Sequence, residues 1–385
     1  MKEMQCHDWL TDFLERRGFA VTRNYLLDTA FKAEFCPPCG AEGGPCIALL
    51  CEYDALPDIG HACGHNLIAE ASVGAALAVK EAMETVGNIH GKLVVLGTPA
   101  EESLCGKEVL IQKGALQGST QRSCATHLQW ISWRPPSQRC NRGKAAHAGA
   151  SPWEGLNALD AAVASYVNVG LLRQQMKTTA RVTVRKARYL GKSVAGVITE
   201  GGGSPNVIPE EAEMSYNVRA PSTAELAELT RRVEACFHAA AEATGCTAHI
   251  DTPALYMHMI HNSAMARTYR KHSHALGVTF LDDVGNNLAL SGASTDCGNV
   301  SHRVPTIHPV FAIGSAQGPA NHTRGFADVA NAAESQPPTL RAAKALALTV
   351  LDLLMDAELM REVQREFVAL QLPSNEKIAS HNIFE

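Results

Sequence analysis

The sequence predicts an α/β protein, in which a mixed sheet covered by helices is interrupted by a smaller inserted α+β domain. Three observations support this prediction: short apolar runs alternate with long helical patterns, the texture changes near Gly143, and prolines flank the changed region. Alternating strands and helices are typical of a sheet whose parallel strands are covered by helices. At about 150 residues per domain, a chain of 385 residues is long enough for two domains.

The first part of the chain reads as strand, helix and strand. Residues 46–53 and 92–98 are short and apolar, which predicts two buried strands, and residues 123–127 predict a third. Between the first two, residues 66–86 are rich in Ala, Leu and Val at helical spacing, which predicts an amphipathic helix. Ligands of such sheets bind beyond the carboxyl ends of the strands, so polar residues that follow each strand are the candidates for function.

The changed region predicts a small α+β sandwich of its own. Its expected elements are a helix over 156–175, strands over 181–186, 196–200 and 212–218, a helix over 223–244 and a strand over 246–251. We therefore expect residues 1–134 and 256–385 to form one domain and residues 135–255 to form an insertion in it. A strand over 309–313 and helices between 340 and 370 would complete the first sheet.

The composition excludes several classes of protein. With 46% apolar residues the chain is too apolar for disorder, and a net charge of −5 offers no basic field for a nucleic acid. The start MKEMQCHDWLTDF has no apolar core of a signal peptide, and Lys344 and Asp352 interrupt the longest apolar stretch, so no membrane partner is expected. Twelve cysteines at irregular spacing favour buried thiols over a disulfide framework. We expect a cytoplasmic protein that binds a small molecule.

Candidate metal ligands follow the predicted strands. They are Cys63 with His65 in a glycine-flanked loop, the adjacent pair Glu101 and Glu102, His127, and His322. Thiolate, imidazole and carboxylate together suit Zn²⁺, and Mn²⁺ is less favoured by the sulfur. A single buried His or Cys is more often a packing residue than a ligand, but the joint occurrence of these residues at successive strand ends predicts a metal site.

The adjacent glutamates add a chemical interpretation. Two neighbouring side chains point in different directions, so that one can bind a metal while the other serves as a general base. A metal lowers the pKa of a bound water towards ~7, and a carboxylate can then remove its proton at neutral pH. The pattern therefore predicts amide hydrolysis.

Five motifs resemble a known family. EYDALPDIGHACGHN, GTPAEE, HAGASPWEGLNALDAA, GGGSPNVIP and STDCGNVS are closely similar to motifs of the aminoacylase and carboxypeptidase-G type of dinuclear metallopeptidases. Within this family they are most similar to the branch of Xaa-Arg (β-alanyl-lysine) dipeptidases, with the aminobenzoyl-glutamate hydrolases as near relatives. The resemblance covers nearly the whole chain. It implies that residues 1–134 and 256–385 form a catalytic metal-binding domain and residues 135–255 a ferredoxin-like lid and dimerisation domain.

The resemblance also implies a ligand set for two zinc ions, with manganese as an alternative. The matching positions are Cys63, which bridges or joins the metals, His65, Glu102, His127 and His322. Glu101 matches the general base. The His-x-Asp that usually follows the first strand is replaced by Glu52-Tyr53-Asp54, so Asp54 is expected to orient the ligand His65.

Three residues of the inserted domain match positions that contact the substrate. His147 matches a histidine that reaches the scissile carbonyl, often from the other subunit of a homodimer, while Asn206 and Arg219 match polar residues that hold the substrate. Asp296 in STDCGNVS is a candidate to line the pocket, and Cys297 is expected to be a core thiol.

The resemblance leaves three functions open. The leading hypothesis is a dipeptidase for small dipeptides with a basic C-terminal residue (Lys, Arg or Orn), including β-alanyl-lysine. The second is an N-acyl or aminobenzoyl amino acid amidohydrolase. The third is an inactive metal-binding or scaffold paralogue with a defective lid, because the segment from 127 to 147 shows no clear strand and residues 183–195 look like an insertion. The presence of all five ligand positions and Glu101 favours an enzyme.

Overall fold

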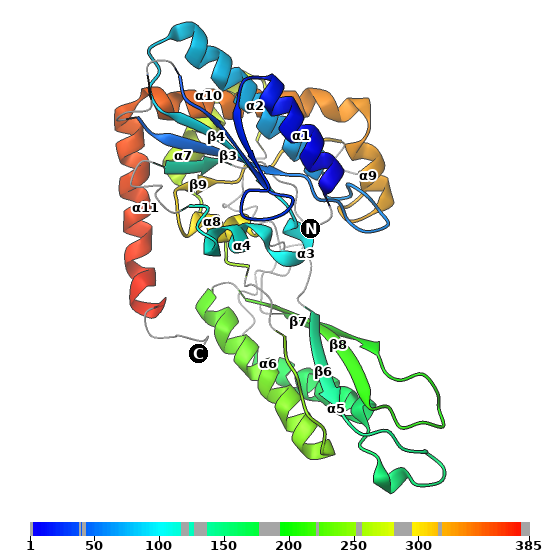
Figure 1. The fold of residues 1–385 in the computed structure, drawn as a ribbon. Coiled ribbons are helices and arrows are strands. Elements are labelled where there is room, and N and C mark those ends of the chain that lie inside the picture. Colours follow the sequence, from blue (N-terminus) through cyan, green and yellow to red (C-terminus); the bar gives the residue numbers. More distant parts are fainter. Residues whose placement is uncertain are drawn as a thin grey trace. The chain divides into compact units, whose positions relative to one another are not determined.

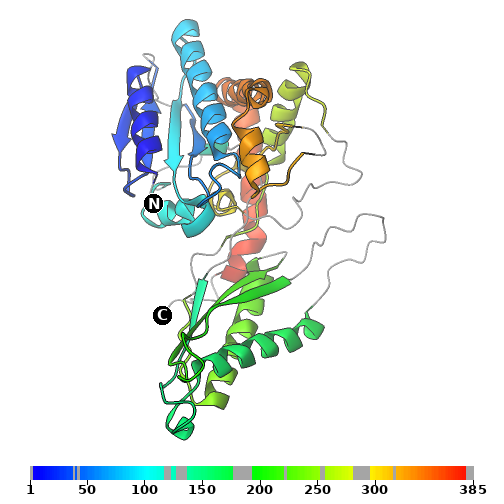
Figure 2. The same ribbon diagram turned by 90° about the vertical axis from the view of Figure 1, so that its right-hand side faces the viewer.

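The computed structural model describes residues 3–37, 40, 44–116, 123–126, 137–176, 193–220, 223–251, 256–280, 295–314 and 318–378. The chain divides into two compact units, which Figures 1 and 2 show from two sides. Unit 1 comprises residues 1–133, 256–287 and 293–385, and unit 2 comprises residues 134–255 and 288–292.

Unit 1 is built on a mixed sheet whose described strands follow the order β1-β2-β4-β3-β5-β9 (Figure 1). These strands are β1 (Ala20–Arg23), β2 (Phe31–Phe35), β3 (Cys46–Glu52), β4 (Lys92–Thr98), β5 (Ser123–Thr126) and β9 (Thr306–Ile307). Strands β4, β3, β5 and β9 run parallel, whereas β2 is antiparallel to β4 and β1 is antiparallel to β2. The carboxyl ends of the four parallel strands therefore lie at one edge of the sheet.

Both faces of this sheet are buried, because side chains alternate between two cores along each strand. Leu49 and Val95 belong to the larger core, whereas Leu50 and Leu96 belong to a second core on the other face. The larger core includes side chains of α1 (Met4–Arg16), α2 (His65–Val86), α7 (Ser263–Ala275), α10 (Gln336–Met355) and α11 (Ala357–Ile378). The second core includes side chains of α4 (Gly106–Gln112) and α8 (Cys297–Ser301).

Glycines mark both ends of α2, the helix that leads away from the sheet edge. Gly64 precedes the helix with φ of 78°, and Gly87 ends it with φ of 74°, a left-handed conformation that favours glycine. Two shorter helices lie close to candidate site residues: α3 (Glu101–Leu104) follows β4, and α9 (Arg324–Ala330) follows residue 322. No helix in the described part of the chain is long and apolar enough to cross a membrane.

The described part of unit 2 is a three-stranded antiparallel sheet with two helices packed against it. Strands β6 (Ser137–Arg142), β8 (Glu211–Arg219) and β7 (Ser193–Glu200) pair in that order, and α5 (Ala158–Leu172) and α6 (Thr223–Thr244) are the helices. Met214 and Tyr216 of β8 pack with Ala162 of α5 and with Val233 and Phe237 of α6. Unit 2 therefore has a core of its own.

The predicted fold class is confirmed, with a mixed sheet in unit 1 and an inserted α+β unit. The strand over 92–98 and the helix over 223–244 have the predicted bounds. The predicted strand over 181–186 lies outside the described residues.

Three expectations about strands were wrong. Residues 246–251 form no strand, because they pass β6 only at its end, where Thr247 makes an isolated bridge with Arg142. Residues 309–313 form no strand either; β9 stops at Ile307, two residues before Pro309, which lacks the N–H that a sheet needs. The third expectation was that the segment from 127 to 147 contains no clear strand, but residues 137–142 form β6. Its polar sequence suits an edge strand, so a search for apolar runs does not detect it.

Candidate metal centre

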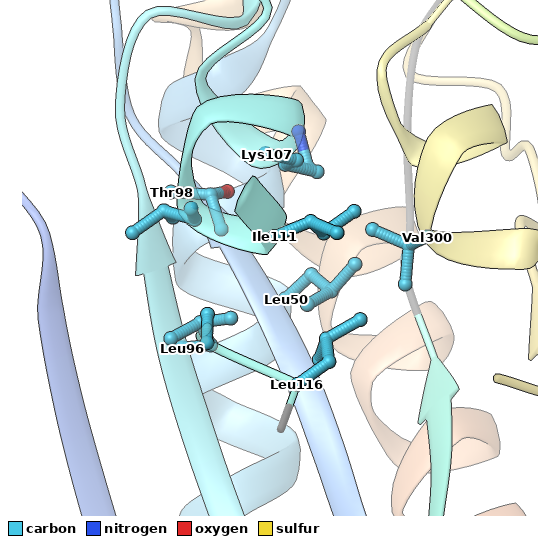
Figure 3. A pocket seen from close by; sticks show the side chains of 9 residues that line it. Leu50, Leu96, Thr98, Lys107, Ile111, Leu116 and Val300 are labelled. Atoms are coloured by element: carbon cyan, nitrogen blue, oxygen red, sulfur yellow. The ribbon is translucent and has the colours of Figure 1, made fainter. Parts of the chain in front are cut away.

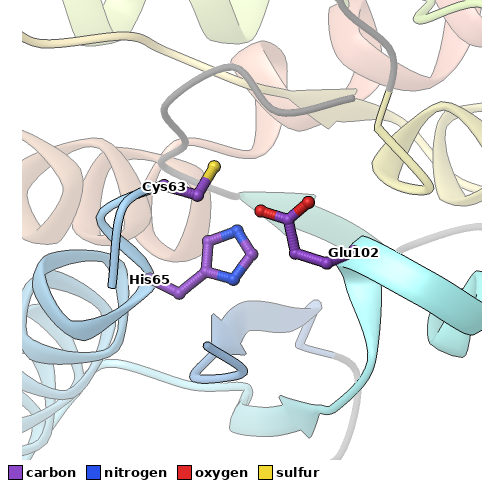
Figure 4. Close-up of side chains that lie close together, drawn as sticks. All are labelled: Cys63, His65 and Glu102. Atoms are coloured by element: carbon purple, nitrogen blue, oxygen red, sulfur yellow. The ribbon is translucent and has the colours of Figure 1, made fainter. Parts of the chain in front are cut away.

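A tight turn after β3 brings Cys63 and His65 to the carboxyl edge of the sheet. The left-handed backbone of Gly64 separates the two residues and lets their side chains face the same point. Glu102, which follows β4, completes a cluster in which the three potential ligand atoms lie within 4.8 Å of one another (Figure 4). All three side chains are buried, so their clustering is not a feature of a solvated surface.

His322 reaches the same cluster from far along the chain. Its backbone N–H donates to the carbonyl of Ala62 over 2.9 Å, and its Nε2 atom lies 3.5 Å from Oε1 of Glu102. This Nε2 atom is buried and has no hydrogen-bond partner among the described residues. The φ of His322 is 63°, and that of Ala100, just before Glu101, is 59°. Such backbone conformations are strained for residues with side chains and gather at functional sites.

Asp54 fixes the orientation of two members of the cluster. Nδ1 of His65 donates to Oδ1 of Asp54 over 2.9 Å, and the backbone N–H of Glu102 donates to Oδ2 over 3.0 Å. Burial opposes the charge on Asp54, but the charge of His65 and these hydrogen bonds lower its pKa. A carboxylate that holds Nδ1 leaves Nε2 of the imidazole to bind a metal, as in many metal-binding histidines.

We therefore expect Asp54→Asn to weaken metal binding by about 10- to 100-fold, because the amide removes the charge that orients His65. The affinity can be measured by competition with a chelator of known strength. Asp58→Asn is the matched control: Asp58 lies in the same loop, is exposed and has a φ of 64°, which Asn tolerates well. Equal affinities of the two variants would contradict the role of Asp54.

The electrostatics of the site fit bound cations. Five carboxylates are buried around the edge of the sheet: Glu52, Asp54, Glu101, Glu102 and Asp296. Burial raises the pKa of the Cys63 thiol, and burial together with the charges of Glu52 and Asp296 raises the pKa of Glu101. A thiolate and a carboxylate in these positions need positive charge beside them in order to be ionised, and metal ions supply it.

The structure adds residues that the sequence did not single out as part of the site. The ammonium of Lys107 contacts Glu52 and Asp296, and the hydroxyl of Tyr256 donates to the backbone carbonyl of Glu101 over 2.6 Å. Lys107 stands in a helix, where a charged residue usually indicates a solvated face, so no local signal marks it. Asp296, a candidate to line the pocket, is buried against Lys107, and Cys297 lies in the core as expected.

Four further residues were predicted for the site. His127 lies outside the described residues; the last described residue before it is Thr126, which ends β5 and pairs with Leu49 and Ile307. His147, Asn206 and Arg219 all belong to unit 2.

Within unit 2, His147 and Asn206 are neighbours. The N–H of Ala148 donates to the backbone carbonyl of Asn206 over 2.9 Å, and both predicted site residues are exposed. Nδ1 of His147 accepts hydrogen bonds from the N–H groups of Gly149 and Ala150, at 3.2 and 3.1 Å. In the neutral imidazole the proton is therefore on Nε2, which is left as a donor.

Arg219 stands apart from this pair along the sheet. It ends β8, whereas the segment that carries Asn206 precedes the start of β8 at Glu211. Eight residue steps of a strand span about 27 Å. Along β8, the backbone of Arg219 is therefore separated by about this length from the strand end that follows the Asn206 segment.

Comparisons with known proteins identify relatives of this chain. Residues 142–245 match the peptidase dimerisation domain. The chain is 43% identical over 383 residues to the Xaa-Arg dipeptidase of Mus musculus, covering 95% of this chain and 85% of that protein. It is 28% identical over 451 residues to a p-aminobenzoyl-glutamate hydrolase chain of Escherichia coli, covering 95% of this chain and 88% of the relative.

The fold is shared with solved structures. A dinuclear metal-binding peptidase of the M20 family from Bacillus subtilis superposes with a TM-score of 0.56 at 18% identity, covering 91% of this chain and 93% of that chain. The common fold includes both units, since the match extends over nearly the whole of each chain.

Proposed function

Since this chain belongs to the M20 family of peptidases, we propose that it is a metal-dependent dipeptidase that hydrolyses small dipeptides with a basic C-terminal residue. The observation that carries the proposal is the cluster of the buried Cys63, His65 and Glu102 with the half-buried His322 at the carboxyl edge of the sheet. The preference for Lys, Arg or Orn, β-alanyl-lysine included, rests on the similarity to the Xaa-Arg dipeptidase.

We propose that the cluster holds two zinc ions, for which manganese could substitute, and that His127, directly after β5, supplies a fifth ligand. One tetrahedral site normally takes four ligands, so five protein donors are more than a single zinc ion needs. Bound zinc would polarise the scissile carbonyl and make a water molecule more acidic.

Glu101 has the position of a general base in this proposal. It adjoins the ligand Glu102, and its Oε2 lies 3.8 Å from Nε2 of His65, so its carboxylate faces the cluster. It would accept the proton of the attacking water and pass it to the leaving amine. The hydrogen bond from Tyr256 to its backbone carbonyl, over 2.6 Å, holds the start of α3 in place.

We propose that the enzyme is a homodimer in which unit 2 of one subunit serves the site of the other. The match to the peptidase dimerisation domain supports this, as does an exposed apolar stripe on α5 formed by Val163, Val167 and Leu171. The separation of Arg219 from His147 and Asn206 also supports it, because two subunits can provide what one copy of the sheet keeps apart. His147 would then donate from Nε2 to the developing oxyanion, Asn206 would hold the carbonyl side of the substrate, and Arg219 its carboxylate.

We propose that the protein is located in the cytosol. None of the nine cysteines whose side chains the structure describes forms a disulfide, which supports a reducing compartment.

Hydrolysis of N-acyl or aminobenzoyl amino acids is the second candidate, favoured by the similarity to the aminobenzoyl-glutamate hydrolase. It needs the same metal centre and base and differs only in the substrate. The hypothesis of an inactive paralogue was based on a missing strand after residue 127 and on an insertion. The first of these no longer supports it, because the strand is present as β6.

A panel of substrates separates these candidates. We expect zinc-loaded protein to hydrolyse β-Ala-Lys and an Xaa-Arg dipeptide with kcat/KM at least about tenfold above the matched Xaa-Met and Xaa-Glu dipeptides, a difference of ~1.4 kcal/mol. Faster cleavage of aminobenzoyl-Glu would replace the leading candidate by the second. Absence of hydrolysis throughout the panel, in protein whose metal content has been verified, would refute both.

A further inference from the structure

A fully buried lysine lies inside a second group of acidic side chains, beside the candidate metal centre. Glu52, Glu101 and Asp296 each offer an oxygen within 4.8 Å of the others, and all three are buried. The Nζ atom of Lys107 contacts Oε1 of Glu52 and Oδ1 of Asp296, and its backbone N–H donates to Oδ2 of Asp296 over 2.8 Å. The ammonium thus contacts Glu52 and Asp296 as a bound cation would. We call Glu52, Glu101 and Asp296 the acidic trio.

The acidic trio adjoins the metal centre through His65. Its Nε2 atom lies 3.5 Å from Oε2 of Glu52 and 3.8 Å from Oε2 of Glu101. A cation bound by His65 would therefore have two carboxylates of the trio close by, in addition to the ligand Glu102. Glu101, the proposed general base, is thus close enough to the metal centre to become a ligand. A feature other than its distance must keep metal ions from binding to it.

The apolar surroundings of Lys107 leave the acidic trio as the partner of its positive charge. Its aliphatic stem lines an apolar pocket with Leu50, Ile111 and Val300 (Figure 3). Apolar walls offer no hydrogen bonds to an ammonium, so its charge is balanced by the carboxylates it contacts. An ammonium also has three donors and no acceptor, and it provides positive charge without any capacity to bind a water or a substrate oxygen as a Lewis acid.

We propose that Lys107 is a positioning residue that excludes metal ions from the acidic trio and thereby keeps Glu101 from becoming a metal ligand. This inference rests on the proposed function, because it takes Glu101 as the base. Without the ammonium, three buried carboxylates would have to take up protons or a cation. An all-oxygen site selects hard cations such as Mn²⁺ or Ca²⁺ over zinc.

The test is to count Mn²⁺ ions in the zinc-loaded full-length protein and in its Lys107→Met variant. We expect Lys107→Met to bind about one Mn²⁺ per chain more than the wild type, because the trio then holds a metal. Its kcat should fall by about 10²-fold with little change in KM, because the base is engaged while the groups that bind the substrate are unchanged. Added Mn²⁺ should lower the kcat of the variant further and leave the wild type unaffected.

Three controls isolate the charge of Lys107. Lys107→Arg keeps the cation and should gain no Mn²⁺, and Glu52→Gln/Lys107→Met lacks one carboxylate of the trio and should gain none either. Lys113→Met removes an exposed lysine close by in sequence and should behave as the wild type. If Lys107→Met does not fold, Lys107→Gln takes its place, since its amide still donates to a carboxylate.

A folded, neutral Lys107 variant that binds as many Mn²⁺ ions as the wild type, and whose kcat does not respond to added Mn²⁺, would overturn the inference. The proposed function is judged separately, on wild-type hydrolysis and wild-type zinc content. The difference in Mn²⁺ content between variant and wild type decides the role of Lys107 whether or not a substrate is cleaved.

Discussion

Glu101→Gln is expected to lower kcat by about 10²- to 10⁴-fold while the zinc content stays unchanged, because the amide cannot accept the proton of the attacking water. The side chain is 2% exposed and sits at the start of α3, where an amide of the same shape can be accommodated. Steady-state rates should be measured on protein whose metal content has been determined in the same preparation. Added zinc should not restore the lost rate.

Glu102→Gln is the matched comparison, because the two glutamates are adjacent and both buried but have different proposed duties. Loss of a charged ligand should weaken metal binding, so that excess zinc or manganese restores part of the activity. Glu81→Gln, on the exposed face of α2, should change neither quantity. Near-normal turnover of Glu101→Gln with full metal content would show that the base has been assigned to the wrong residue.

His147→Ala is expected to lower kcat by about 10²- to 10³-fold with the metal content intact, the effect of losing one donor to the oxyanion. The histidine is exposed in unit 2, so water can replace its Nδ1 as acceptor for the N–H groups of Gly149 and Ala150, and the substitution should have little effect on stability. His249→Ala, another exposed histidine of unit 2, is the control and should keep wild-type rates.

Mixing His147→Ala with Glu101→Gln tests whether the histidine acts across the dimer. Half of the dimers after random exchange are mixed, and one of the two sites in each would combine an intact Glu101 with an intact His147. About a quarter of the wild-type activity should therefore return. No recovery in confirmed mixed dimers would place the action of His147 within its own subunit, or outside catalysis altogether.

Elements and contacts could be predicted from the sequence where they depend on neighbouring residues or on a clear periodicity of apolar residues. The turn around Gly64 follows from local chemistry, and the strand of residues 92–98 from an apolar run that is buried on both faces. The link between Asp54 and His65, which lie in one loop region, could also be anticipated. Residues near one another in the chain and at the ends of parallel strands are brought together by the topology of the sheet alone.

Contacts between distant segments could not be predicted in the same way. The ion pair of Lys107 with Asp296 spans 189 positions, and nothing in the helix around Lys107 marks it as buried. Strand β6 was missed because an edge strand has no need of apolar residues. The opposite error, a strand over 246–251, arose because the alternating pattern is present but only one residue finds a partner.

The central claim is that a zinc centre at the sheet edge hydrolyses dipeptides. A titration of chelated protein with zinc, in which bound metal and hydrolysis of β-Ala-Lys are followed in the same samples, tests it most directly. We predict that binding saturates near about two ions per chain and that hydrolysis, absent at the start, reaches its maximum over the same range. Full hydrolysis before any zinc is added, or saturation with zinc without hydrolysis of any substrate of the panel, would contradict the claim.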